Sequence, residues 1–113
     1  MVEYKSNEAH LDLVFQALAD GTRRSLLNHL REGDYRVGDL AKHYDVSLNA
    51  ISKHLKVLER ADLINRTVSG RVHTCCINAD RLRDIEKWMS PYKKFWEKSL
   101  DNLENYLIEK KEK

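Results

Sequence analysis

The stretch VGDLAKHYDVSLNAISKHLKVLERADLI, residues 37–64, decides the fold of this chain. Its first part, residues 37–44, has helical periodicity over about two turns. Ser47, which closes the short link that follows, is a favourable N-cap for a second helix over about 48–60. Two short helices joined so closely predict a helix-turn-helix over about 37–60. The second helix has an apolar stripe that we expect to be buried: Leu48, Ile51, Leu55 and Leu58.

The sequence period changes after residue 62. Residues 63–68 and 72–77 are rich in β-branched side chains, and Ser69-Gly70 between them is a tight-turn signal. We expect a two-stranded hairpin over about 63–77, with three basic side chains near its tip: Arg66, Arg71 and His73. A helix-turn-helix followed by a hairpin predicts a winged helix-turn-helix, mainly α with a small β-hairpin.

Helical segments precede this motif. Residues 7–19 have apolar side chains at helical spacing. Asp20 is a plausible N-cap for a second helix that runs to about Arg31, and Gly33 favours the end of that helix. Residues 35–37 are compatible with a short extended stretch.

The C-terminal segment, residues 79–109, is helical again, with apolar and aromatic groups three or four positions apart. Pro91 is unfavourable in an undisturbed helix interior, so we expect the helix to kink or restart at Ser90-Pro91. The predicted order of elements in one domain, residues 1–113, is therefore α-α-α-α-β-β-α.

Length and composition limit the class of protein. A chain of 113 residues with 42% hydrophobic and 34% charged residues has the size of one domain. It contains no apolar run of about 18 residues and no apolar N-terminal segment, so we expect neither a membrane span nor a secretory signal. The two adjacent cysteines cannot form a disulfide framework, which favours the reducing cytoplasm.

Positive charge is concentrated in the middle of the chain. The net charge is +2 overall, but it is −2 over residues 1–35, +3 over residues 36–73 and +1 over residues 74–113. The helix-turn-helix and the hairpin are therefore the place to expect an anionic partner.

Burial of the apolar stripe turns the opposite face of the second helix outward. Short polar side chains near the start of that helix suit base edges in a major groove, and lysines suit phosphates. The alternative is an ordinary solvated face, because helix-turn-helix pairs also occur in proteins that bind no nucleic acid. With the hairpin arginines, the expected DNA-binding residues are Ser47, Asn49, Ala50, Ser52, Lys53, His54, Lys56, Arg66 and Arg71.

Three segments together resemble the ArsR/SmtB family of bacterial transcriptional repressors: ALADGTRRSLLNHL (residues 17–30), the stretch quoted above, and GRVHTCCINADRL (residues 70–82). The resemblance begins at about Leu13 and ends at about Leu82. The segment PYKKFWEKSLDNL (residues 91–103) looks like the tail of a branch that does not sense metals. The resemblance implies a homodimer in which the first and last helices pair across a two-fold axis.

The same resemblance implies a mode of DNA binding. Each subunit would insert residues 48–60 into the major groove of one half of an inverted-repeat operator, and the hairpin would reach the flanking minor groove or backbone. The homodimer would repress transcription by blocking polymerase. The expected dimer interface comprises Leu11, Val14, Phe15, Leu18, Trp88, Tyr92, Phe95, Trp96 and Leu103.

The chain departs from the family's metal sensors at both of their common metal sites. Those sensors have a Cys-x-Cys pair just before an Asp-Leu, whereas here Asp39-Leu40 follow residues 36–38, which are Arg, Val and Gly. A second site uses His and carboxylates on the last helix, and this sequence has no His after His73. Because no catalytic motif is present either, we expect no metal, no cofactor and no enzyme activity.

Two alternatives stay open at this point. His73 and Cys75 share one face of a strand, beside Cys76, and could form a metal- or thiol-responsive sensor, although neighbouring strand residues point to opposite faces and disfavour a shared ion. The other alternative is a protein-interaction module that uses the aromatic tail and binds no DNA. The residues identify neither an inducer nor an operator sequence.

Overall fold

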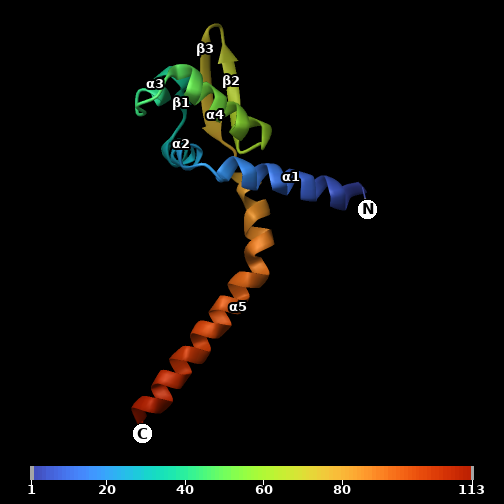
Figure 1. Ribbon diagram of the computed structural model, residues 1–113, viewed down its shortest axis with the longest axis vertical. Helices are drawn as coiled ribbons and strands as arrows, with labels where there is room; N and C mark the ends of the chain where they lie inside the picture. The colour runs from blue at the N-terminus through green and yellow to red at the C-terminus, as the bar shows by residue number, and fades with distance from the viewer. Residues whose placement is uncertain (1, 113) are drawn as a thin grey trace. The chain divides into compact units, whose positions relative to one another are not determined.

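The computed structural model describes residues 2–112 and forms a winged helix-turn-helix followed by a long helix (Figure 1). It has the predicted architecture, mainly helical with a small antiparallel hairpin. In chain order the elements are α1 (Val2–Leu18), α2 (Gly21–Glu32), β1 (Tyr35–Arg36), α3 (Val37–Ala41), α4 (Leu48–Arg60), β2 (Ile64–Ser69), β3 (Val72–Ile77) and α5 (Ala79–Glu112). The chain forms two compact units, one that ends at Leu82 and one that begins at Arg83.

The corner between α1 and α2 is fixed by polar groups. The Asp20 carboxylate accepts a hydrogen bond from the Arg23 backbone N–H at 3.2 Å, which confirms the predicted N-cap of α2. The side chains of Arg23 and Arg24 donate to the last carbonyls of α1, which lack partners within that helix. Arg23 Nε lies 2.6 Å from the Ala17 oxygen, and Arg24 Nη1 lies 2.6 Å from the Leu18 oxygen.

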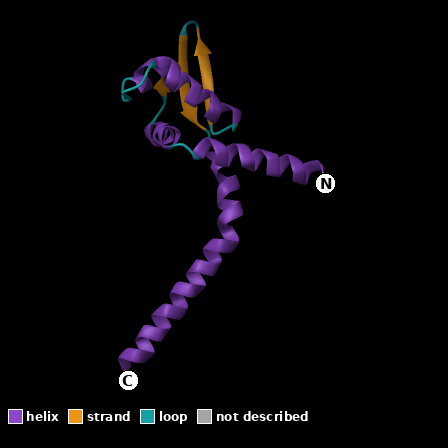
Figure 2. Cartoon of the chain, viewed as in Figure 1, coloured by secondary structure: helices purple, strands orange, loops and turns teal. Residues whose placement is uncertain are grey.

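The sheet has three antiparallel strands in the order β1-β3-β2. The predicted hairpin is β2 and β3, with Ser69 opposite Val72 and Gly70 in the left-handed region at φ 61°. A glycine adopts that conformation without steric cost. Figure 2 shows the two long strands of the hairpin beside α4. The short strand β1 pairs Tyr35 with Cys75 and adds one element to the predicted order.

The core of the first unit lies between α1, α2, α4 and the sheet. Ile51, Leu55 and Leu58 of α4 are completely buried, as predicted, but Leu48 is 55% exposed, so its predicted burial is wrong. Leu48 is the first residue of α4, and it lines an open pocket. The other fully or almost fully buried apolar side chains include Leu26, Leu30, Leu40, Leu63 and Ile64.

Val14 of α1 was expected at the dimer interface, but the structure places it in the core. Val14 is completely buried within the first unit, together with Ala17, because α1 packs against both α2 and α4. A side chain that is already covered by its own chain cannot be the contact surface for a partner. Val14 is therefore a core residue in this structure.

Helix α3 is shorter than expected and α5 is slightly longer. After Ala41 the chain tightens into turns, in which the backbone N–H of Tyr44 donates to the Ala41 oxygen at 3.1 Å. Helix α5 continues through Pro91, so of the two outcomes expected there, a kink or a restart, the restart is wrong and the kink stays a prediction. The hydrogen bond that proline removes does not end the helix. Among residues 2–112, no helix combines the length and apolar character needed to cross a membrane.

Candidate nucleic-acid interface

The outward face of α4 is polar and cationic, as the sequence predicted. Asn49, Lys53 and Lys56 are exposed, while Ala50 and Ser52 between them are half-buried. This face lies opposite the fully buried residues of the same helix. A rigid helix with short polar groups near its start and lysines along its length presents the groups that base edges and phosphates accept.

Ser47 precedes α4 as its N-cap, and His54 lies within the helix. The Ser47 hydroxyl accepts a hydrogen bond from the Ala50 backbone N–H at 3.1 Å, which confirms the predicted N-cap of α4. The half-buried His54 has its Nδ1 atom 3.4 Å from Arg23 Nη1 on α2. His54 therefore has a contact within the fold as well as a position beside the outward face.

The two hairpin arginines have different environments. Arg71 follows Gly70 in the turn between the strands and is exposed. Arg66 lies in the middle of β2 opposite Cys75, and its side chain is 17% exposed. Its Nε atom lies 3.3 Å from a carboxylate oxygen of Glu59 on α4. The prediction that Arg66 lies near the tip is wrong, because the ion pair holds this side chain against α4.

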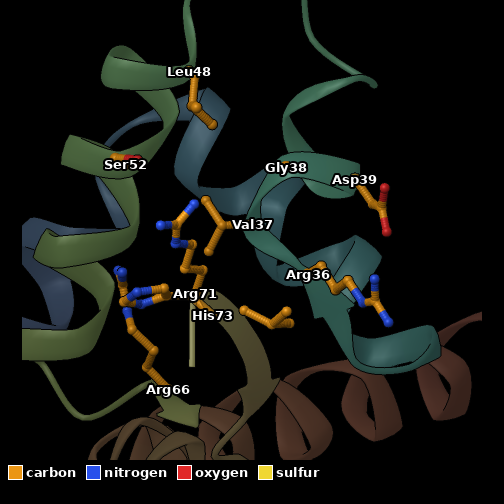
Figure 3. Close-up of a pocket in the computed structure, with 10 residues that line it drawn as sticks. Arg36, Val37, Gly38, Asp39, Leu48, Ser52, Arg66, Arg71 and His73 are labelled. Carbon is orange, nitrogen blue, oxygen red and sulfur yellow. The ribbon is translucent and has the colours of Figure 1, made fainter. Parts of the chain in front are cut away.

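A pocket of about 430 Å³ lies between the start of α3, the start of α4 and the hairpin. Its lining includes Leu48, Ser52, Arg66, Arg71 and His73 (Figure 3). The sequence predicts Arg66, Arg71 and His73 together on the hairpin, but it does not predict that they share a cavity with Leu48 and Ser52. No local pattern carried that information, since residues of several helices and strands line the pocket.

The cysteines of β3 differ in burial. Cys75 is completely buried, and this burial raises the pKa of its thiol, which disfavours the reactive thiolate. Cys76 is half-buried, and its Sγ lies 3.7 Å from the Asn65 backbone oxygen. Within the part of the chain that the structure describes, no group of three His, Cys, Asp or Glu side chains is arranged to hold a metal ion.

The second unit presents an exposed apolar surface along α5. Phe95 and Trp96 are 65% and 59% exposed, and the rings of Trp88 and Tyr92 lie 5.2 Å apart. The exposed large hydrophobic residues of this helix are Trp88, Met89, Tyr92, Phe95, Trp96, Leu100, Leu103, Tyr106, Leu107 and Ile108. Large apolar surfaces of this kind mark sites of association.

Helix α1 has a smaller exposed apolar surface. Phe15 is exposed, whereas Leu11 and Leu18 are half-buried. Of the four α1 residues expected at a dimer interface, only Val14 is removed from contact by its own chain.

A buried helix-turn-helix core, an outward polar helix and an adjacent hairpin define the winged helix-turn-helix class of DNA-binding protein. Residues 20–66 match the family model described as "Bacterial regulatory protein, arsR family". The transcriptional repressor SdpR of Bacillus subtilis (strain 168) is 38% identical over 76 residues, a match that covers 67% of this chain and 84% of that protein. The chain belongs to the ArsR family.

Solved structures agree with this assignment. A crystal structure of an ArsR family transcriptional regulator is 38% identical, with a TM-score of 0.74 over 80% of this chain and 93% of that one. The solution structure of a homodimeric winged helix-turn-helix DNA-binding domain from Mycobacterium bovis is 22% identical, with a TM-score of 0.66 over 83% and 88% of the two chains. The family and the fold confirm the predicted class, a DNA-binding transcriptional regulator.

Proposed function

We propose that the protein is a repressor that binds an inverted-repeat operator in double-stranded DNA as a homodimer and thereby blocks polymerase. The observation that carries this proposal is the two-sided character of α4. On its inner face Ile51, Leu55 and Leu58 are completely buried, and its outer face presents Asn49, Lys53 and Lys56. A face fixed in this way is preorganised for a duplex, because little side-chain packing has to change on binding.

The residues of this face have separate roles in the proposal. Asn49 and Ser52 contact base edges, and the Ala50 methyl group packs against the methyl group of a thymine. Lys53, Lys56 and Arg71 contact phosphates, which position the helix and supply the salt-dependent part of the affinity. Ser47 and His54 lie beside the base-reading residues, and Arg66 supports the hairpin through Glu59.

The homodimer rests on the apolar surfaces of α1 and α5. Its interface comprises Leu11, Phe15, Leu18, Trp88, Tyr92, Phe95, Trp96 and Leu103. The Mycobacterium bovis domain, described as homodimeric, supports this proposal. Two recognition helices related by a two-fold axis would lie about 34 Å apart and match half-sites one helical turn apart. The proposed dimer acts in the cytoplasm, without a cofactor and without catalysis.

Sequencing of the genomic fragments that the purified protein retains tests the proposal. We expect enrichment of a sequence with two-fold symmetry, retained less well as salt rises. Lys98→Ala is a matched control, since it removes an exposed cation of α5 outside the proposed face. Fragments without a shared motif, or a motif without two-fold symmetry, would contradict the proposed dimeric operator complex.

A further inference from the structure

The pocket between α4 and the hairpin gathers positive charge at one place. In Figure 3 the side chains of Arg66, Arg71 and His73 lie on the same side of the cavity, whereas Arg36 and Asp39 point away from them. The only carboxylate that pairs with any of these three within the described residues is Glu59, through Arg66 Nε at 3.3 Å. Among the described residues no ion pair involves Arg71, so the hollow keeps one positive charge that no carboxylate compensates.

Two nitrogen atoms in this hollow are buried without a partner. Among the described residues, none forms a hydrogen bond with Arg66 Nη2 or with His73 Nδ1. A buried donor that lacks an acceptor destabilises the fold, and such groups are rare in native structures. Arg66 can only donate, and His73 donates from Nδ1 whenever that atom carries a proton. Arg66 Nη2 therefore lacks an acceptor among the described residues, and His73 Nδ1 lacks one whenever it is protonated.

The cavity has ample room for a tetrahedral anion. Its volume of about 430 Å³ admits a compact group, and the apolar side chains of Val37, Leu48 and Val72 form part of its wall. The Ser52 hydroxyl belongs to the same lining and can donate as well. Several donors around one anion in a partly apolar hollow give strong, charge-assisted hydrogen bonds.

We propose that this pocket binds a phosphate group, held by Arg66 Nη2, Arg71 and His73. One source is the duplex itself. In the proposed complex, the DNA backbone between the groove that α4 enters and the groove that the hairpin reaches would pass this cavity. That form of the inference rests on the proposed function. The other source is free phosphate or a phosphate ester, which would occupy the same donors and compete with DNA.

The imidazole nitrogen resonances of His73 in the ¹⁵N-labelled full chain report occupancy of the pocket. Inorganic phosphate is titrated against chloride at equal ionic strength and pH, and a duplex carrying the selected operator is titrated separately. Arg71→Gln is the test variant because Arg71 is exposed and outside the core, and Arg31→Gln removes an equally exposed cation of α2 that does not line the pocket.

We expect the His73 resonances of the wild type to shift as the ligand is added. The affinity for that ligand should be reduced at least about tenfold in Arg71→Gln and should be unchanged in Arg31→Gln. A response to inorganic phosphate establishes the free-anion source, even if no duplex binds and the proposed function fails. A response to duplex alone, abolished by a neutral methylphosphonate at one backbone position, establishes the backbone source. Salt-dependent duplex binding that leaves His73 unperturbed, with no response to phosphate, would overturn the phosphate pocket while the repressor function stands.

Discussion

Helices α4 and α5 both have an apolar stripe, but only α4 buries most of that stripe within its own unit. Ile51, Leu55 and Leu58 are completely covered, whereas Phe95 and Trp96 in the second unit are more than half exposed. The partner that each helix can accept differs accordingly. The outward face of α4 is polar and lies over a packed core, so it suits an anionic partner. The exposed face of α5 is apolar, so it requires another apolar surface.

Truncation of a buried α4 residue gives the largest expected effect. Leu55→Ala leaves a cavity in the core and should destabilise the first unit by about 2–5 kcal/mol. Each kcal/mol corresponds to a fall in Tm of about 4–8 °C for a domain of this size, measured by circular dichroism. Leu48→Ala is the control in the same stripe, and because Leu48 is 55% exposed its Tm should stay close to that of the wild type. Equal losses of Tm for the two variants would show that Leu48 is covered as fully as Leu55.

Introduction of charge on the exposed stripe of α5 should instead weaken association. Trp96→Glu places a carboxylate within the proposed dimer interface, and loss of a central aromatic contact costs about 2–4 kcal/mol of dimerisation free energy. Sedimentation equilibrium should therefore show a dimer Kd raised by a factor of roughly 30 to 1,000. Lys98→Glu, on an exposed residue outside the stripe, is the control and should leave Kd nearly unchanged. An unaltered Kd for Trp96→Glu would remove α5 from the interface.

Replacement of polar residues on α4 should separate base contacts from phosphate contacts. Asn49→Ala should narrow the free-energy gap between operator and random duplex by about 1–3 kcal/mol, since a base-edge contact discriminates between sequences. Lys53→Ala should weaken both duplexes alike and lower the slope of log K against log salt by about 0.9. Fluorescence anisotropy over a range of salt measures both quantities. Equal losses on operator and random DNA for Asn49→Ala would refute its base-reading role.

These contrasts also show what the sequence could predict. The period of the apolar residues identified most of the buried face of α4. The β-branched runs around Ser69-Gly70 identified the hairpin, and Asp20 and Ser47 identified the two N-caps, because these features follow from local spacing and local hydrogen bonds. The exposure of Leu48 and the burial of Val14 depend on which neighbouring elements cover each side chain. Periodicity along one helix carries no information about the position of its neighbours.

The same limit applies to the candidate interface. The outward position of Asn49, Lys53 and Lys56 followed from the buried stripe of their own helix. The ion pair of Arg66 with Glu59 joins two elements, and the pocket around His73 joins more than two. Contacts of this kind depend on the packing of strand against helix, so only the folded structure reveals them.

The smallest expected effect is a pH dependence confined to the first unit. The hydrogen bond from the Arg23 backbone N–H lowers the pKa of the Asp20 carboxyl from its ordinary value of 3.8. The charged cap therefore stabilises the fold fully above that value, and this contribution is lost as the pH falls through the lowered pKa. Asp20→Asn keeps an acceptor at the N-cap but has no carboxylate to titrate. Between about pH 5 and pH 3 the Tm of the wild type should fall slightly more than that of Asp20→Asn, and parallel curves would contradict this assignment.

The most direct test of the central claim is affinity cleavage of operator DNA from the outward face of α4. An iron chelate is attached to Asn49→Cys in a chain whose own cysteines are replaced by Cys75→Ala and Cys76→Ser, and the cut positions are mapped on both strands. We predict two sets of cuts, related by the operator dyad and centred in major grooves about one helical turn apart. The same chelate on Lys98→Cys should not give these cuts. Identical patterns from both positions, or no cleavage from Asn49→Cys by a variant that still binds the duplex, would contradict insertion of α4 into DNA.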